Sequence, residues 1–518
     1  MKRRIFLQSV AACMPGIAIA ASATAPLATT RHGKVRGYRD SGVNVFKGVR
    51  YGADTAPRRF MAPLAPQAWR GVADATGHGA SSPQSKGEEA LSEDCLFLNV
   101  YTPGLRDQVK RPVMFYIHGG AYNNGSGSSA LYDGVRLCRR GDVVVVTVNH
   151  RLNAFGYLYL ARHGGNQFVD SGNAGQLDLI LALQWVRDNI AEFGGDPDNV
   201  TVFGQSGGGA KIATLMAMPA AGGLFHRAAT MSGQQVTASG PLNAALRAQA
   251  LLDALKLPAG RLEEIRSMPY QRILEVLGTR DPVLPFGGVS FAPVLDERNL
   301  LRHPFYPDAP AQSAHIPMMI GNTHDETRAF LGGDAANFSL SWEQLPAKLA
   351  TNMRVDIGPE MVIAAYRKLY PALSASDLLF KITTASRSWR GAIIEAEERA
   401  KAGTPAFVYQ LNWATPKDGG KFGAPHASDI ELVFDNIAKP GASAIGPQAQ
   451  TMADVMSDAF IAFAHTGNPG NPLIPRWEPY DLARRQTMIF DVPPQMEDDP
   501  RGAERKLFAK VPYVQPGT

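Results

Sequence analysis

One serine in this chain lies in a setting that can make it a nucleophile. Ser206 is the centre of a Gly-x-Ser-x-Gly pattern, residues 204–208, between the apolar run 200–203 and the run 210–215. This order predicts a strand that turns sharply into a helix, with glycines where a Cβ would block close backbone approach. A serine there projects next to the N–H groups of a helix N-terminus, which can stabilise an oxyanion. The alternative is a chance match among 51 glycines, but the flanking runs favour a nucleophile.

A serine hydroxyl is a weak nucleophile near neutral pH, so it needs a histidine base and a carboxylate that orients the histidine. In folds built around this turn, both partners follow the serine in the chain. His426 is the best candidate because it lies in the loop 423–427 after a predicted strand, where such sheets place chemistry. Four other downstream histidines have structural explanations at helix ends, turns or strand starts: His226, His303, His315 and His465.

The candidates for the acid are two neighbouring residues. Asp325 and Glu326 follow the apolar run 316–321, which predicts another strand of the same sheet. Either carboxylate can serve, with the other capping the following helix. The residues alone leave both open.

A glycine-rich loop is the candidate oxyanion hole. His118-Gly119-Gly120-Ala121-Tyr122 follows the predicted strand 113–117 and resembles the loops that supply backbone donors in esterases and lipases. The N–H of Gly207 would be a further donor. The alternative is an ordinary glycine turn, but the serine pattern downstream favours the donor role.

Several segments must position these residues. Continuous apolar runs at 113–117 and 143–148 predict strands covered by helices on both faces. Helical spacing over 173–192, followed by a strand at 200–203, predicts a βαβ unit and hence a parallel sheet. Further strands are expected at 95–101, 316–321 and 406–411, and an opening hairpin at 35–38 and 43–48. The helical stretches 242–277 and 342–402 are interpreted as insertions that form a lid or pocket wall.

Composition is that of an ordinary globular protein, with 45% hydrophobic and 19% charged residues. The formal net charge is +5, but the first 25 residues hold three basic residues and no acid, so the remainder carries only +2. This gives a nucleic-acid partner no electrostatic support.

The N-terminus resembles an export signal. Residues 1–25 have a basic start, an apolar stretch and Ala-x-Ala cleavage sites, and the run from Arg3 to Gln8 resembles a twin-arginine signal. We therefore expect a periplasmic or secreted protein with no stable membrane span, since the apolar stretch is short and contains Pro15 and Gly16. Lipid attachment at Cys13 is a minor alternative. Without the signal only Cys95 and Cys138 remain, both expected to be buried small hydrophobic residues, and no His/Cys spacing predicts a metal.

Taken together, the motifs resemble those of the type-B carboxylesterases, which include bacterial para-nitrobenzyl esterases and the cholinesterases. The resemblance covers nearly all of the mature chain and rests on the segments 92–100, 118–120, 149–151, 193–197, 204–208 and 231–233, and on His426. It implies an α/β-hydrolase fold, with a mostly parallel central sheet and helices on both faces, in one domain over residues 26–518.

The resemblance also assigns roles. It implies that Glu326 is the acid of the triad and that Ser232 lies beside it. The implied oxyanion donors are Gly120, Ala121 and Gly207. Two structural ion pairs are implied, Arg59 with Glu93 and Arg151 with Asp178.

The chain departs from the family at several positions. Gln205 replaces the usual glutamate before the nucleophile, and Ser85 falls near the position of the choline-binding tryptophan, so a cholinesterase is not expected. The usual partner of Cys95 is missing, which makes the family's N-terminal disulfide doubtful. The expected substrate pocket contains Tyr122, Gly287, Val289 and Phe291. Gly287, Gly288 and Val289, which precede Phe291, fall where cholinesterases place bulky acyl-pocket aromatics, so a roomier acyl pocket is expected.

The expected function is hydrolysis of a small carboxylic ester through an acyl-enzyme, without a cofactor. An amidase, a carbamate hydrolase or a specialised detoxifying esterase could use the same triad, because the motifs do not report pocket shape. A non-catalytic adhesion protein is a remote alternative, since such homologues normally lose the serine or the histidine.

Overall fold

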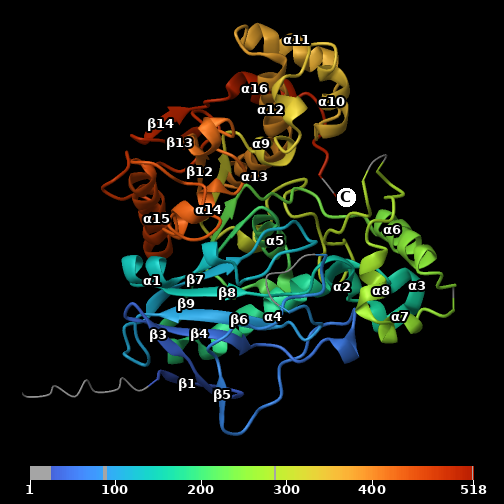
Figure 1. The fold of residues 1–518 in the computed structure, drawn as a ribbon, viewed down its shortest axis with the longest axis vertical. Helices are drawn as coiled ribbons and strands as arrows, with labels where there is room; N and C mark the ends of the chain where they lie inside the picture. The colour runs from blue at the N-terminus through green and yellow to red at the C-terminus, as the bar shows by residue number, and fades with distance from the viewer. Residues whose placement is uncertain (1–24, 86–89, 259, 285–286, 516, 518) are drawn as a thin grey trace, which may run out of the picture.

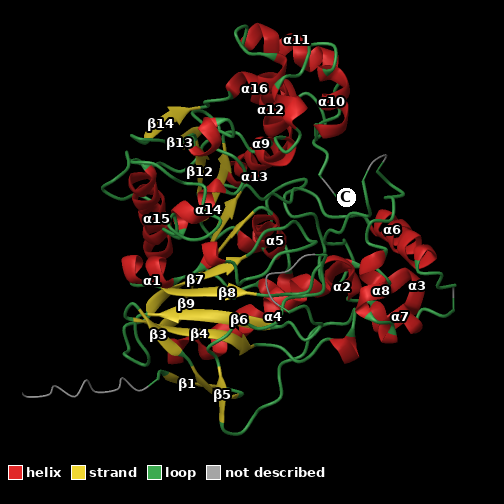
Figure 2. Cartoon of the chain, in the orientation of Figure 1, coloured by secondary structure: helices red, strands yellow, loops and turns green. Residues whose placement is uncertain are grey.

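The computed structural model describes residues 25–85, 90–258, 260–284, 287–515 and 517. In this part of the chain the main sheet has eleven strands (Figures 1 and 2). From one edge to the other they are β14 (Gln495–Asp498), β13 (Gln486–Phe490), β12 (Ala406–Leu411), β11 (Met318–Thr323), β10 (Arg227–Met231), β9 (Gly195–Gln205), β7 (Arg111–Ile117), β8 (Val144–Val148), β6 (Phe97–Thr102), β4 (Val43–Arg50) and β3 (Tyr38–Asp40). Neighbours from β8 to β13 pair in parallel, and the outer strands pair antiparallel.

Helices cover both faces of this sheet. All seven residues of β7 are buried, and successive side chains point to opposite faces. Val113, Phe115 and Ile117 pack in the cluster that includes α4 (Ala174–Asn189), α5 (Gly207–Leu215) and α13 (Arg390–Lys401). Met114 and Tyr116 pack in the cluster that includes α1 (Val135–Gly141), α14 (Ser428–Val433) and α15 (Ala449–Thr466). The continuous apolar runs thus arise because both faces of the central strands are buried, as the sequence predicts.

Two groups of helices lie outside these layers. The first group, at the right of Figure 1, contains α2 (Asn153–Tyr157), α3 (Ala161–Gly164), α6 (Pro241–Ala254), α7 (Glu264–Ser267) and α8 (Tyr270–Glu275). The second, at the top, contains α9 (Arg328–Leu331), α10 (Leu345–Asn352), α11 (Pro359–Leu369), α12 (Ala375–Thr384) and α16 (Gly502–Phe508). The predicted insertion 242–277 contains α7, α8 and nearly all of α6, and the predicted insertion 342–402 contains α10, α11 and α12. The other helices of the two groups, α2, α3, α9 and α16, come from segments outside both predictions. α13, placed within the second insertion by sequence, instead packs on β11 and β12 as the crossover helix between them.

The opening hairpin is the other difference. The predicted hairpin paired the segments 35–38 and 43–48, but β3 pairs with β4 while Val35 belongs to a separate sheet of β1 (Leu27–Thr30), β2 (Gly33–Arg36) and β5 (Val72–Asp74). Gly37 separates the two sheets, and a Cβ there would lie 2.1 Å from the Val45 carbonyl oxygen. The chain can switch sheets at this point because glycine permits that approach.

Candidate active site

Ser206 lies on the sharp turn between β9 and α5. Its φ of 56° and ψ of −125° are rarely adopted by residues with a side chain, so the surroundings must hold them. The Ser206 N–H donates to the Met231 carbonyl at the end of β10, at 2.7 Å. A Cβ on Gly208 would lie 1.9 Å from the Ile117 carbonyl oxygen, which explains the glycine after the serine.

Glu326 and His426 are in direct contact. Nδ1 of His426, in the loop between β12 and α14, meets Oε2 of Glu326, which lies just after β11 and is fully buried. The other carboxylate oxygen accepts the Thr323 N–H at 3.0 Å and the Asn322 side-chain amide at 3.3 Å. Burial on its own would raise the pKa of Glu326, but His426, the Ser232 hydroxyl and the Thr323 N–H lower it below its ordinary value. Glu326 is therefore held ionised against the imidazole.

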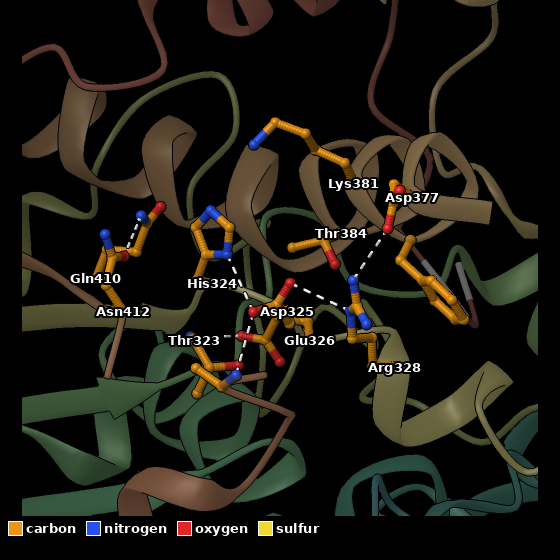
Figure 3. A network of polar contacts seen from close by, with 12 residues as sticks. Thr323, His324, Asp325, Glu326, Arg328, Asp377, Lys381, Thr384, Gln410 and Asn412 are labelled. Atoms are coloured by element: carbon orange, nitrogen blue, oxygen red, sulfur yellow. Dashed lines mark hydrogen bonds and ion pairs between the residues drawn. The ribbon is translucent and has the colours of Figure 1, made fainter. Parts of the chain in front are cut away.

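Asp325, the other candidate acid, has different partners. Figure 3 shows its carboxylate between His324 and Arg328, at 3.1 and 3.4 Å. It also accepts the Ala424 N–H at 3.1 Å. Asp325 therefore anchors the loop that carries His426, while Glu326 contacts the imidazole itself.

Three of the four alternative histidines have structural partners elsewhere. Nδ1 of His226 accepts the Val200 N–H, and Nδ1 of His303 accepts the Ala238 N–H. Nε2 of His465 lies 2.9 Å from the Gly141 carbonyl oxygen. None of these contacts involves the turn at Ser206.

The glycine-rich loop after β7 lies against the serine turn. Gly120 and Ala121 have φ of 83° and 51°, and the Gly120 carbonyl accepts the N–H groups of Asn123 and Asn124 at 3.1 Å each. A Cβ on Gly207 would lie 2.1 Å from the Ala121 carbonyl oxygen. The backbone segments that carry the three expected oxyanion donors are therefore adjacent.

Lys211 on α5 was not expected from the sequence to have a role at this loop. It is fully buried, and its Nζ donates to the carbonyl oxygens of Ala121 at 2.8 Å and His118 at 3.2 Å. Burial lowers the pKa of Lys211 to about 7. The His118 and His150 rings stack beneath the loop with centroids 4.8 Å apart, and burial lowers the pKa of His118 to about 3. The sequence feature that could have indicated these contacts between Lys211 and the loop is a lysine inside an otherwise mostly apolar helix.

Ser232 and Gln205 lie next to the reactive residues. The Ser232 hydroxyl is one of the groups that lower the pKa of Glu326. Nε2 of Gln205 lies 3.2 Å from Nε2 of His426, the nitrogen that faces away from Glu326. Because the Gln205 side chain is an uncharged amide, it places no negative charge next to the His426 imidazole.

A cavity of about 170 Å³ opens beside Ser206. Tyr122 and Phe291 line it, as expected, together with Ser206, Gly207 and His426. The hydroxyl of Tyr122 donates to the Gln235 side chain at 2.7 Å. A larger cleft of about 630 Å³, near Trp69 and Phe97, contains none of the expected site residues.

Two expected pocket residues do not line the cavity. Val289 packs with the helices of the first group, and a Cβ on Gly287 would meet open space. The expectation that Gly287 and Val289 line the pocket is therefore corrected. In this segment the residues that line the cavity are Ser290 and Phe291, which follow Val289 directly.

The far end of the chain supplies part of the cavity wall. Tyr513, Gln515 and Gly517 line it, although no sequence motif marks them. The side-chain oxygen of Gln515 accepts the Val236 N–H at 2.9 Å, and the Val514 N–H donates to the Arg354 carbonyl at the same distance. Only the fold brings this segment to the serine.

The two implied ion pairs are present, and both cysteines are buried as expected. Arg59 pairs with Glu93, and Arg151 with Asp178 at 2.7 Å. Cys95 and Cys138 are both buried and unbridged. Among the described residues there is no group of three or more potential metal ligands, and no helix has the length and apolarity needed to cross a membrane.

The fold and this site define an α/β-hydrolase. The family model of the carboxylesterase family matches residues 24–508. The para-nitrobenzyl esterase of Bacillus subtilis is 34% identical over 508 residues, covering 94% of this chain and 99% of that one. The phenmedipham hydrolase of Pseudarthrobacter oxydans is 31% identical over 477 residues, covering 88% and 92%.

Solved structures agree. A carboxylesterase from Geobacillus stearothermophilus superposes with a TM-score of 0.83 at 36% identity, covering 93% of this chain and 99% of that one. An esterase from Clostridium hathewayi, described as able to hydrolyse aliphatic aromatic polyesters, has a TM-score of 0.79 at 33% identity, with 95% and 99% covered. The chain belongs to the carboxylesterase family, whose named members are carboxylic ester hydrolases.

Proposed function

We propose that this carboxylesterase works through an acyl-enzyme on Ser206, with His426 as general base and Glu326 as the residue that orients it. The observation that carries the proposal is the contact between His426 Nδ1 and the buried, ionised Glu326 at the cavity that Ser206 also lines. That contact places the proton of a neutral imidazole on Nδ1 and leaves Nε2 able to accept one.

In the proposed reaction, Ser206 Oγ bonds to the ester carbonyl carbon while its proton passes to His426 Nε2. The N–H groups of Gly120, Ala121 and Gly207 stabilise the oxyanion. The carbon–oxygen bond to the alcohol then breaks, and His426 returns the proton to that alcohol. Water, deprotonated by His426, attacks the acyl carbon; the bond to Ser206 Oγ then breaks, His426 returns the proton to Ser206, and the carboxylic acid is released.

Replacement of the nucleophile tests this directly. Ser206→Ala should lower kcat/KM for 4-nitrophenyl butyrate by at least about 1,000-fold, because loss of a triad member removes covalent catalysis. It should also abolish labelling by a fluorophosphonate probe. Ser267→Ala, at an exposed serine of α7, is the matched control and should behave as the parent. Parent-like activity of a folded Ser206→Ala protein would exclude the proposed nucleophile.

A further inference from the structure

The cavity beside Ser206 contains a charge that the proposed chemistry does not use. Arg387 lines the cavity, and it is the one lysine or arginine among the described residues that do so. None of those residues is an aspartate or a glutamate. The cavity therefore offers a cation to its contents and no matching anion of its own.

Arg387 is held in place by an unusual helical turn. The segment Ala385–Trp389 is a π-helix between α12 and α13. Single π-helical turns within α-helices are rare and often occur at functional sites. Ala385, Ser386, Ser388 and Trp389 are buried, and Arg387 and Ser388 of this turn line the cavity. The extra residue of the turn thus fixes where the guanidinium lies.

The guanidinium of Arg387 contacts a ring rather than an acid. Its Cζ lies 4.5 Å from the centroid of the Phe330 ring, and that ring lies 4.7 Å from the ring of His426. No ion pair or hydrogen bond of the Arg387 side chain is found within the described part of the chain. Arg151 and Arg247, by contrast, are buried and paired with Asp178 and Asp281.

The groups around Arg387 offset its charge only in part. Burial lowers the pKa of Arg387, and the nearby charge of Glu326, which is itself in contact with His426, acts in the opposite direction. Burial raises the pKa of Glu395 to about 8, so that Glu395 is mostly protonated at neutral pH. Burial also raises the pKa of Tyr513, which stays neutral. Burial, together with the nearby positive charge of Arg387, lowers the pKa of Arg354, so a second cation lies close to Arg387. A partly buried cation in such surroundings gains most from an anion that enters the cavity.

We propose that Arg387 binds a carboxylate of the substrate, so that the preferred substrates are esters that carry a carboxylate in addition to the scissile bond. This inference rests on the proposed function of Ser206. A guanidinium can hold a carboxylate through two parallel hydrogen bonds, and the apolar Phe330 face beside it excludes water from one side. The carboxylate can belong to the acyl part, as in a monoester of a dicarboxylic acid, or to the alcohol part.

Matched ester pairs distinguish the two positions. One pair is the 4-nitrophenyl monoester of glutaric acid against 4-nitrophenyl pentanoate. The other is the butyrate ester of 4-hydroxybenzoate against that of 4-hydroxybenzamide. In the parent, kcat/KM for the charged member should exceed that for the neutral one by about ten-fold or more in one pair. In Arg387→Gln this ratio should fall toward one, and in Arg387→Lys it should be intermediate.

The controls separate a failed inference from a failed function. Arg367 is an exposed residue of α11 whose guanidinium lies 4.6 Å from the centroid of the Trp342 ring. Arg367→Gln therefore removes another guanidinium stacked on a ring and should leave the ratio unchanged. Glutarate should inhibit hydrolysis of the neutral ester competitively, and at least ten-fold less well in Arg387→Gln. No preference for charge in either pair, or a ratio and inhibition unaltered in a folded Arg387→Gln protein, would overturn the inference. If the parent protein hydrolysed none of these esters, that result would instead contradict the proposed function.

Discussion

At the scale of single residues, the chemistry follows from local pattern and the electrostatics do not. The serine turn and the histidine loop are evident from glycines and apolar runs, because a strand-to-helix turn restricts the backbone so strongly. The choice between Asp325 and Glu326 depends on which carboxylate reaches His426. That depends on the direction of each side chain, which the sequence of two adjacent acids does not show. Lys211 and Arg387 were missed for a related reason. A charged residue in a predicted helix is expected to face solvent, and only the fold shows whether other residues cover it.

Lys211 leads to a prediction about pH. Its pKa is about 7 in the folded protein and 10.5 when exposed, so between these values the unfolded chain binds more protons. The free energy of unfolding should therefore rise with pH over this window, by at most about 1.4 kcal/mol per pH unit from this residue. Lys211→Met should reduce that slope, measured by urea unfolding from pH 7 to pH 9.5.

The same substitution tests the tie to the oxyanion loop. Without the two hydrogen bonds to the loop carbonyls, kcat should fall about ten-fold or more while KM changes little, because the donors act on the transition state. Lys368→Met, at an exposed lysine of α11, should alter neither the slope nor kcat. An unchanged slope in Lys211→Met would show that another group causes the pH dependence.

At the scale of elements, long apolar strands and the βαβ unit were predictable, while short strands were not. β10 has only five residues, two of them alanine, and β13 begins with Gln486 and Thr487, so neither shows a marked apolar run. α13 was assigned to an insertion because its sequence is helical like its neighbours. Its small buried residues Ala392 and Ala396, which let it pack on the sheet, distinguish it only in the folded protein.

The serine turn leads to a prediction about packing. Gly208→Ala would place a methyl group 1.9 Å from the Ile117 carbonyl oxygen, a fixed backbone atom. We expect a loss of unfolding free energy of roughly 2 kcal/mol or more and a marked loss of activity. Gly278→Ala, where the new methyl group would meet open space, should be close to neutral. Thermal unfolding of both variants measures the difference, and equal melting temperatures would contradict the packing argument.

At the scale of the whole molecule, one sheet joins segments from Tyr38 to Asp498, and two helical groups lie beside its layers. Family resemblance made this architecture predictable, since the motifs cover nearly the whole chain. The wall formed by residues 513–517 was not predictable, because a segment without motif or periodicity gives no sign of where it docks.

Export is a proposal at this scale, since residues 1–24 lie outside the described part of the chain. We propose that the protein is exported in folded form through its twin-arginine-like start. Changing both Arg3 and Arg4 to lysine should retain the protein in the cytoplasm of a bacterial host, because that pathway reads the arginine pair. Esterase activity in periplasmic and cytoplasmic fractions measures this. Equal export of the parent and the double variant would exclude that route, and retention of label from a lipid precursor would indicate attachment at Cys13.

The docking of Tyr513, Gln515 and Gly517 at the cavity has a practical consequence for anyone handling the protein. A purification tag, a fluorescent fusion or a surface linker attached close after Gly517 would be tethered beside the cavity that Gly517 lines. Attachment ahead of the small sheet that begins at Leu27 carries no such penalty, because that end of the chain contributes nothing to the described lining of the cavity.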